Sequence, residues 1–204
     1  MTRTLFFSAC LAGSLALPCA AQIPMTPVPH AGDITMVSED GTLDGKMFRT
    51  ATHMRLDMAV DGNDASSIID MENRKVSAMV DVGMGQPVVM DMDLAKFGPA
   101  ATEPGEDAVK TGERKTVSGE ACDVYRDAEQ KADICVTPDG IVMEAVGKDG
   151  SMTLSNVVRG PQDASLFVLP AGGMDLGDLM QQALEDADPD DAEQIGKMLE
   201  GMFD

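Results

Sequence analysis

Short runs in which apolar and polar residues alternate recur along the middle of this chain. In segment 53–60, Met54, Leu56, Met58 and Val60 alternate with polar or small residues, and segments 75–82 and 86–93 repeat the pattern. A period of two places alternate side chains on opposite faces of a β-strand. The intervening segments are too short for parallel crossovers. The sequence therefore predicts an antiparallel β-meander that buries one face.

Further strands are expected after an irregular stretch. Residues 94–115 contain glycine, proline and many charges, which predicts a loop with a helical turn near 107–110. Alternation resumes in segments 116–126, 132–137, 140–147 and 151–159, with turns at 138–140 and 148–150, and segment 166–173 closes the β region. The prediction is a mainly β domain over residues 33–173, with about 8–10 strands.

The last thirty residues change from strand-like to helix-like periodicity. Leu176, Leu179, Met180 and Leu184 fall on one helical stripe, and a second stripe ends the chain. Residues 174–204 are therefore predicted to form acidic amphipathic helices. Such apolar stripes normally face a core, although a mobile lid or a partner-binding tail is the alternative.

The N-terminus has the three parts of a secretory signal peptide. Arg3 precedes the apolar segment 5–17, and Pro18 precedes small residues that predict cleavage after Ala21. About 13 apolar residues are too few to cross a ~30 Å membrane core. We therefore expect residues 1–21 to be a signal peptide, residues 22–32 to be a proline-rich lead-in, and the mature protein to be periplasmic or secreted and not membrane-spanning.

The charge balance argues against some partners. The chain has 35 acidic and 15 basic residues, a formal net charge of −20. Such a surface repels nucleic-acid phosphates and anionic lipid headgroups. No nucleic-acid partner is expected.

The cysteines indicate one disulfide. Of the four, Cys10 and Cys19 lie in the expected signal peptide, which leaves Cys122 and Cys135. An isolated pair in an oxidising compartment is most simply a structural disulfide. Equal spacing about a polar turn places the two cysteines opposite each other on neighbouring strands. A redox-active pair is the alternative, but the C-x-x-C spacing is missing.

No chemical motif indicates catalysis. His30 and His53 are the two histidines, and the chain has no G-x-S-x-G, H-E-x-x-H or glycine-rich phosphate loop. We expect no enzyme activity, no cofactor and no dedicated metal site. Copper(I) could bind thioethers, with His53 and Met54 or Met90 and Met92 as candidates. Alternation places these methionines on the face that carries valine and leucine, away from His53, which favours a core.

The order of several motifs resembles a known family. GKMFRTATHMRLDMAV, SSIIDMENRKVSAMVD, TVSGEACDVYR, DICVTPDGIVMEA and ASLFVLPAGG follow one another between residues 45 and 173. This order is similar to a family of exported bacterial proteins of unknown function, which looks related to the periplasmic lipoprotein carriers of the Lol system. The resemblance implies a strongly curved antiparallel half-barrel whose concave side is covered by helices.

Two classes of function remain. The first is a binding protein whose methionine-rich concave face holds an acyl chain or an apolar segment of a lipoprotein, since flexible thioethers suit ligands of varied shape. The second is a non-catalytic structural or stress-related protein with a packed core. The residues expected to line the ligand site are Met54, Leu56, Met58, Val80, Met90 and Met92. The covering helices would contribute Leu179, Met180, Leu184, Met198 and Leu199.

Overall fold

The computed structural model describes residues 27–94 apart from 61, 82, 84 and 85, residue 105, residues 108–169 apart from 129, and residues 174–175. The first six strands are β1 (His30–Ser38), β2 (Gly41–Arg49), β3 (His53–Val60), β4 (Asn63–Asp70), β5 (Lys75–Val80) and β6 (Val88–Asp93). They are followed by β7 (Val109–Val117), β8 (Glu120–Asp127), β9 (Ala132–Val136), β10 (Val142–Val146), β11 (Gly150–Arg159) and β12 (Met174–Asp175). A short 3-10 helix, η2 (Ala164–Phe167), lies between β11 and β12.

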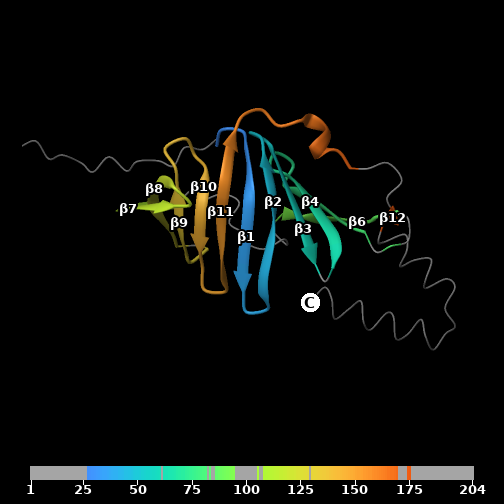
Figure 1. The fold of residues 1–204 in the computed structure, drawn as a ribbon, viewed down its shortest axis with the longest axis horizontal. Coiled ribbons are helices and arrows are strands. Elements are labelled where there is room, and N and C mark those ends of the chain that lie inside the picture. The colour runs from blue at the N-terminus through green and yellow to red at the C-terminus, as the bar shows by residue number, and fades with distance from the viewer. Residues whose placement is uncertain are drawn as a thin grey trace, which may run out of the picture.

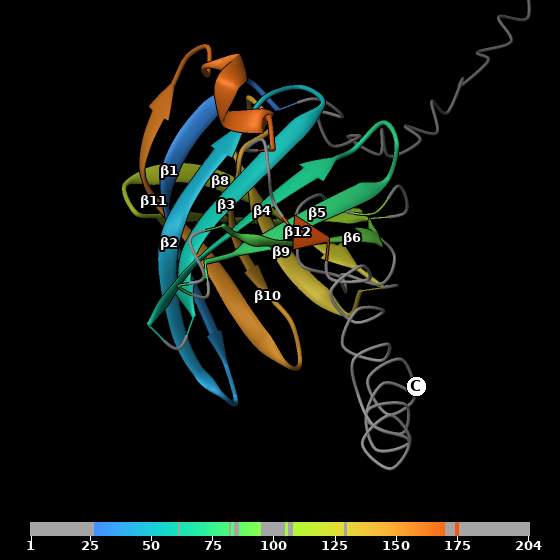
Figure 2. The same cartoon turned by 90° about the vertical axis from the view of Figure 1, so that its right-hand side faces the viewer.

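All twelve strands belong to one open sheet. Their order is β12-β6-β5-β4-β3-β2-β1-β11-β10-β9-β8-β7 (Figure 1). Every neighbouring pair is antiparallel except β12 with β6, which is parallel. The sheet is curved: β1, β2 and β11 lie on one side of the view in Figure 2, while β5, β6, β9 and β10 bend toward the other. This confirms the predicted mainly β fold with a curved, unclosed antiparallel sheet.

Tight turns explain why neighbours in sequence are neighbours in the sheet. Ser118 and Gly119 both have positive φ angles, 52° and 89°, between the ends of β7 and β8. Two successive left-handed residues match the twist of a two-residue hairpin, and glycine adopts that conformation readily. β1 departs from the simple meander, because one of its two neighbours in the sheet, β11, is far from it in the sequence.

Among the residues that the structure describes, the core consists of two apolar clusters. The larger joins buried residues of β1–β5 to residues of β7–β11, and it includes Met54, Ile69, Val76, Met143 and Leu154. The smaller contains Tyr125, Ala132, Ile134, Val136, Val142 and Ala145. Strand β9 contributes to both, since Cys135 belongs to the first cluster and its neighbours Ile134 and Val136 to the second. This strand is therefore buried on both faces.

Three boundaries within residues 27–169 differ from the sequence predictions. β1 begins at His30, so residues 30–32 of the expected lead-in are already paired with β2, since the chain has backbone donors available once Pro29 is passed. The loop expected over 94–115 is wrong from Val109 onward, because β7 occupies Val109–Val117. Its charged residues lie largely exposed, which hides the strand pattern. Leu166 and Phe167 are in η2 and not in a strand.

The disulfide between Cys122 and Cys135 is present, with 5.4 Å between the two Cα atoms. The cysteines are not directly opposite, however, because the register pairs Val124 with Cys135. The turn between β8 and β9 is centred one residue later than the midpoint of the two cysteines. The disulfide therefore joins diagonal neighbours on adjacent strands.

A cluster of charged residues joins two distant parts of the sheet. Arg159 of β11 donates two hydrogen bonds to the carboxylate of Glu120 on β8, at 2.9 and 3.0 Å. Its Nε donates to Asp139, in the turn between β9 and β10, at 2.6 Å. Hydrogen bonds from Arg159 lower the pKa of both carboxyl groups. This guanidinium thus links three segments at one end of the sheet.

In the described residues, no helix is long and apolar enough to cross a membrane. The helices expected over 174–204 do not begin at 174, because Met174 and Asp175 form β12 against the edge strand β6, whose free backbone groups accept a further strand. The signal peptide expected over residues 1–21 and the remainder of those helices, residues 176–204, lie outside the residues that the structure describes.

Candidate functional site

The strand register places all six expected ligand-lining residues on one face of the sheet. Met58 of β3 continues through Ala65 of β4 and Val80 of β5 to Val88 of β6. The other members lie in two further rows that run across the same four strands. One row consists of Met54, Ile69, Val76 and Met92, and the row next to it consists of Leu56, Ser67, Ala78 and Met90. We call this surface of β3–β6 the methionine face.

The methionine face is packed at one end and partly open at the other. Met54 and Leu56 are only 2% and 3% exposed and belong to the larger core cluster. Met58 and Met92 are half-buried against that cluster. Met90, by contrast, is 36% exposed. The half-buried residues Met58, Ala65, Val80 and Val88, together with Met90, form what we call the apolar row.

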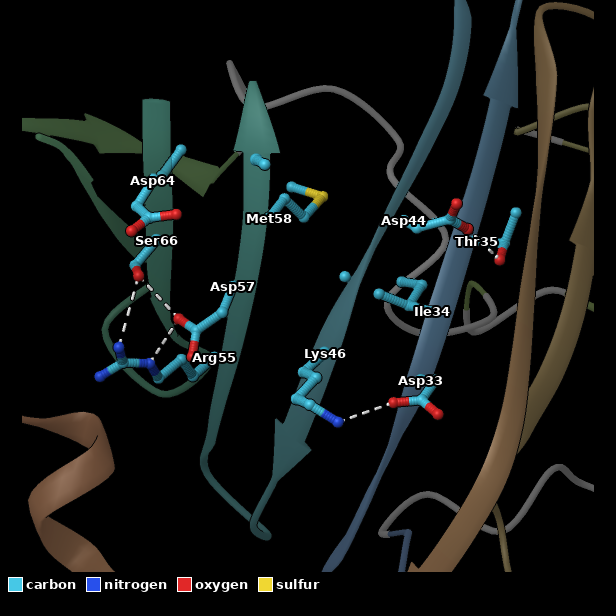
Figure 3. Close-up of a pocket in the computed structure, with 13 residues that line it drawn as sticks. Asp33, Ile34, Thr35, Asp44, Lys46, Arg55, Asp57, Met58, Asp64 and Ser66 are labelled. Carbon is cyan, nitrogen blue, oxygen red and sulfur yellow. Dashed lines mark hydrogen bonds and ion pairs between the residues drawn. The ribbon is translucent and has the colours of Figure 1, made fainter. Parts of the chain in front are cut away.

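A pocket opens where β2 and β3 separate. Their pairing runs from Arg49 with Met54 to Gly45 with Met58 and then stops, although β2 continues to Gly41 and β3 to Val60. The resulting gap, which we call the split, borders a pocket of about 790 Å³. The pocket is lined by Asp33, Ile34, Thr35, Asp44, Gly45, Lys46, Arg55, Asp57, Met58, Ala59, Asp64, Ala65 and Ser66 (Figure 3). Met58 is the member of the expected ligand-lining set that borders it.

On one wall of the pocket, Arg55 organises a polar network. Its Nε donates to Asp57 at 2.7 Å, and one of its terminal amino groups donates to the backbone carbonyl of Leu166 in η2 at 2.9 Å. Ser66 donates to the same carboxylate oxygen of Asp57 at 2.7 Å. Figure 3 shows these three side chains directed toward one another. The network fixes the carboxylate of Asp57 at the edge of the pocket.

On the opposite wall, two further carboxylates are held in place. Asp33 accepts a hydrogen bond from Asn156 at 2.8 Å and pairs with Lys46 at 2.9 Å, and these two partners lower its pKa. Asp44 accepts a hydrogen bond from the Thr35 hydroxyl at 2.6 Å. The side chain of Asp64, across the split, is exposed. The pocket thus contains four carboxylates against the two cations Lys46 and Arg55, an excess of negative charge.

Sequence reasoning did not identify this pocket. Arg55 and Asp57 alternate with the methionine face on β3, and the polar residues that β1, β2 and β4 contribute form no motif that indicates a ligand. The one available signal was Gly45, because glycine inside a strand often marks a close approach of another backbone. A Cβ atom at this position would lie 2.3 Å from the carbonyl oxygen of Asp57.

The two histidines lie in different surroundings. His53 hydrogen-bonds the Thr52 hydroxyl at 2.8 Å, and its ring centroid is 5.9 Å from that of Phe167, whereas neighbouring Met54 is in the core. His30 is 2% exposed, and its Nδ1 lies 2.8 Å from the carbonyl oxygen of Val28. Within the described ranges, no group of three His, Cys, Asp or Glu side chains is placed to hold a metal ion.

Comparison with known proteins gives only distant similarities. No family model and no curated protein matches the sequence. Two structures of PNGF-II, in the P21 and C2 space groups, give TM-scores of 0.47 and 0.45 at 12% and 13% identity, covering 76% and 82% of this chain. The Pseudomonas aeruginosa MucA/MucB complex gives a TM-score of 0.37 at 11% identity over 72% of this chain.

The chain spans about a third of the PNGF-II chains (32%) and rather more than half of the matched MucA/MucB chain (57%). With TM-scores below 0.5, these similarities support no inference about function. The function is therefore argued from the residues of this chain.

Proposed function

We propose that this protein is an exported, non-catalytic binding protein that holds an acyl chain or a similarly apolar segment, such as part of a lipoprotein, on its apolar row. The observation that carries this proposal is the change in burial along the methionine face. Met54 and Leu56 are packed into the core, whereas Met90, on the same face, is 36% exposed. The signal-peptide pattern of residues 1–21 supports export.

The apolar row suits an apolar ligand for two reasons. Its side chains lie across four adjacent strands, so a chain molecule lying over them would contact several at once. Two of them are methionines, whose flexible thioethers adapt to different shapes. Burying a twelve-carbon chain at ~0.8 kcal/mol per CH₂ provides on the order of 9 kcal/mol before the costs of association. After those costs, we expect an affinity in the micromolar range or weaker.

Titration with a fluorescent fatty acid tests this function. The full chain is expected to bind the fatty acid saturably, and Met90→Glu is expected to weaken binding at least about tenfold, because it places a carboxylate beside the acyl chain. The matched control is Val158→Glu, since Val158 is a 67% exposed apolar residue on β11, outside the methionine face. Equal losses in both variants, or no loss in Met90→Glu, would reject the apolar row as the site.

A structural protein with a packed core is the second candidate. The burial of Met54, Leu56 and Ile69 to 3% exposure or less favours it, because these residues already fill the adjoining part of the methionine face. On this account the fatty acid does not bind saturably to the wild-type chain. The same titration therefore distinguishes the two functions.

A further inference from the structure

We infer that the split between β2 and β3 is a second binding site, which accepts an extended peptide segment of a partner protein as an added β-strand. The inference does not depend on acyl binding, although Met58 and Ala65 of the apolar row also line the pocket at the split. It depends on the unpaired strand edges, on the pocket they border, and on the side chains that face it from each side of the sheet.

The two strands that border the split each have an unpaired edge there. Residues 41–44 of β2 pair with β1 on one side, but within the described part of the chain no strand pairs with their other side. Ala59 and Val60 of β3 pair with β4 on one side, and their other side likewise faces the split. Alternate residues of each segment therefore direct N–H and C=O groups into the split. Exposed strand edges of this kind are templates for an additional strand.

The pocket at the split offers space for an added segment. The pocket at the split has a volume of about 790 Å³ and is lined by residues from both hairpins, β1–β2 and β3–β4. Figure 3 shows β2 and β3 on either side of it, with Asp44 and Lys46 on the one and Met58 and Asp57 on the other. Binding sites of this size are large enough to accept several residues of a ligand.

The side chains around the split indicate the chemistry of the partner segment. Successive side chains of an added strand point to opposite faces of the sheet. On one face they would meet the three carboxylates of Asp44, Asp57 and Asp64 and the two cations Lys46 and Arg55, and on the other face Met58. The matching segment therefore alternates basic and apolar residues. The excess of carboxylates in the pocket, on a chain of net charge −20, favours such a cationic segment.

The experiment uses the full chain and a fluorescein-labelled peptide of sequence Val-Lys-Val-Lys-Val-Lys, with anisotropy as the readout. Saturable binding that weakens with salt is expected. The decisive control is the same peptide N-methylated at every backbone nitrogen, which has the same charge but has no backbone N–H group left to donate to a neighbouring strand. We expect it not to bind. Equal binding of the methylated peptide, or no binding of the parent peptide, would overturn the inference.

Protein variants locate the site. Asp44→Lys and Asp64→Lys, both at exposed positions, are each expected to weaken peptide binding about tenfold or more, as charge reversals near a bound cation do. Asp149→Lys is the matched control, because its side chain is 91% exposed and does not line the pocket at the split. If all three variants weaken binding equally, the peptide binds through overall charge and the split is not its site. Fatty-acid binding by Asp44→Lys should be unchanged, so the two proposals fail separately.

Discussion

The side chain of Met58 lies directly beside Gly45 on the neighbouring strand. A Cβ atom on Gly45 would be 2.6 Å from Cγ of Met58 and 2.3 Å from the carbonyl oxygen of Asp57. Gly45 and Met58 form the last pair between β2 and β3 before the strands separate. Met58 therefore belongs both to the apolar row and to the pocket at the split.

This close approach makes Gly45 sensitive to substitution. Gly45→Ala is expected to destabilise the fold by about 1–3 kcal/mol, because a methyl group would overlap backbone atoms that cannot move freely. Gly147→Ala is the control, since the nearest atom to a Cβ there is 3.8 Å away. Urea denaturation should show Gly147→Ala within about 0.5 kcal/mol of wild type. Equal stability of the two variants would show that β3 can move away from Gly45.

Truncation of two methionines should separate packing from binding. Met54→Ala is expected to lower the free energy of unfolding by about 2–5 kcal/mol, as for other buried methionines. Met90→Ala should cost less than about 1 kcal/mol, because Met90 is 36% exposed. Fatty-acid affinity should fall in Met90→Ala. The division of the methionine face is incorrect if Met90→Ala is as destabilising as Met54→Ala.

The disulfide is expected to stabilise the fold without taking part in binding. It joins residues separated by 13 positions. Closing such a loop lowers the conformational entropy of the unfolded chain, which raises the free energy of unfolding by roughly 2–3 kcal/mol. The double variant Cys122→Ala, Cys135→Ala should lose about that amount in urea denaturation and retain its fatty-acid affinity. A loss of affinity in a variant that remains folded would place the ligand near β8 and β9.

His30 predicts a pH-dependent stability. Burial lowers the pKa of His30 below its usual 6.5, and the charges of Arg49 and Arg159 lower it further. In mildly acid solution the unfolded chain therefore binds a proton that the folded chain does not. Stability should be complete above pH 6.5 and fall below it, by at most about 1.4 kcal/mol per pH unit.

Urea denaturation between pH 7.5 and 5.5 measures this slope. His30→Gln should show a smaller loss of stability toward low pH than wild type, since it lacks the buried imidazole of His30. Identical slopes in the two proteins would mean that folding does not lower the pKa of His30.

The elements that sequence analysis predicted are those with strong alternation. The register of β3–β6 brings together Met54, Met58, Val80 and Met92 because a period of two fixes the face of each side chain. The same logic identified the disulfide but not its diagonal position, because the centre of a turn depends on local backbone geometry. The first seven residues of β7, 109–115, were missed because Val109 is their one apolar residue and the rest are polar, charged or glycine, which gives no apolar alternation.

The split could not be predicted because it is a property of where a strand pair stops. Nothing in residues 41–44 or 59–60 distinguishes a paired strand from an unpaired one. Separation of the two hairpins depends on the twist and curvature of the whole sheet, which are set by contacts far apart in the sequence. Only Gly45, without a side chain at the last paired position, marked the place.

Photolabelling with a diazirine-bearing fatty acid tests acyl binding on the apolar row most directly. The full chain is irradiated with the bound probe and digested, and the labelled peptides are mapped by mass spectrometry. We predict labels concentrated on the segments of β3–β6 that carry Met58, Val80 and Met90, displaced by unlabelled fatty acid and reduced in Met90→Glu. Labels concentrated on β7–β10, or spread along the chain without displacement, would contradict the account.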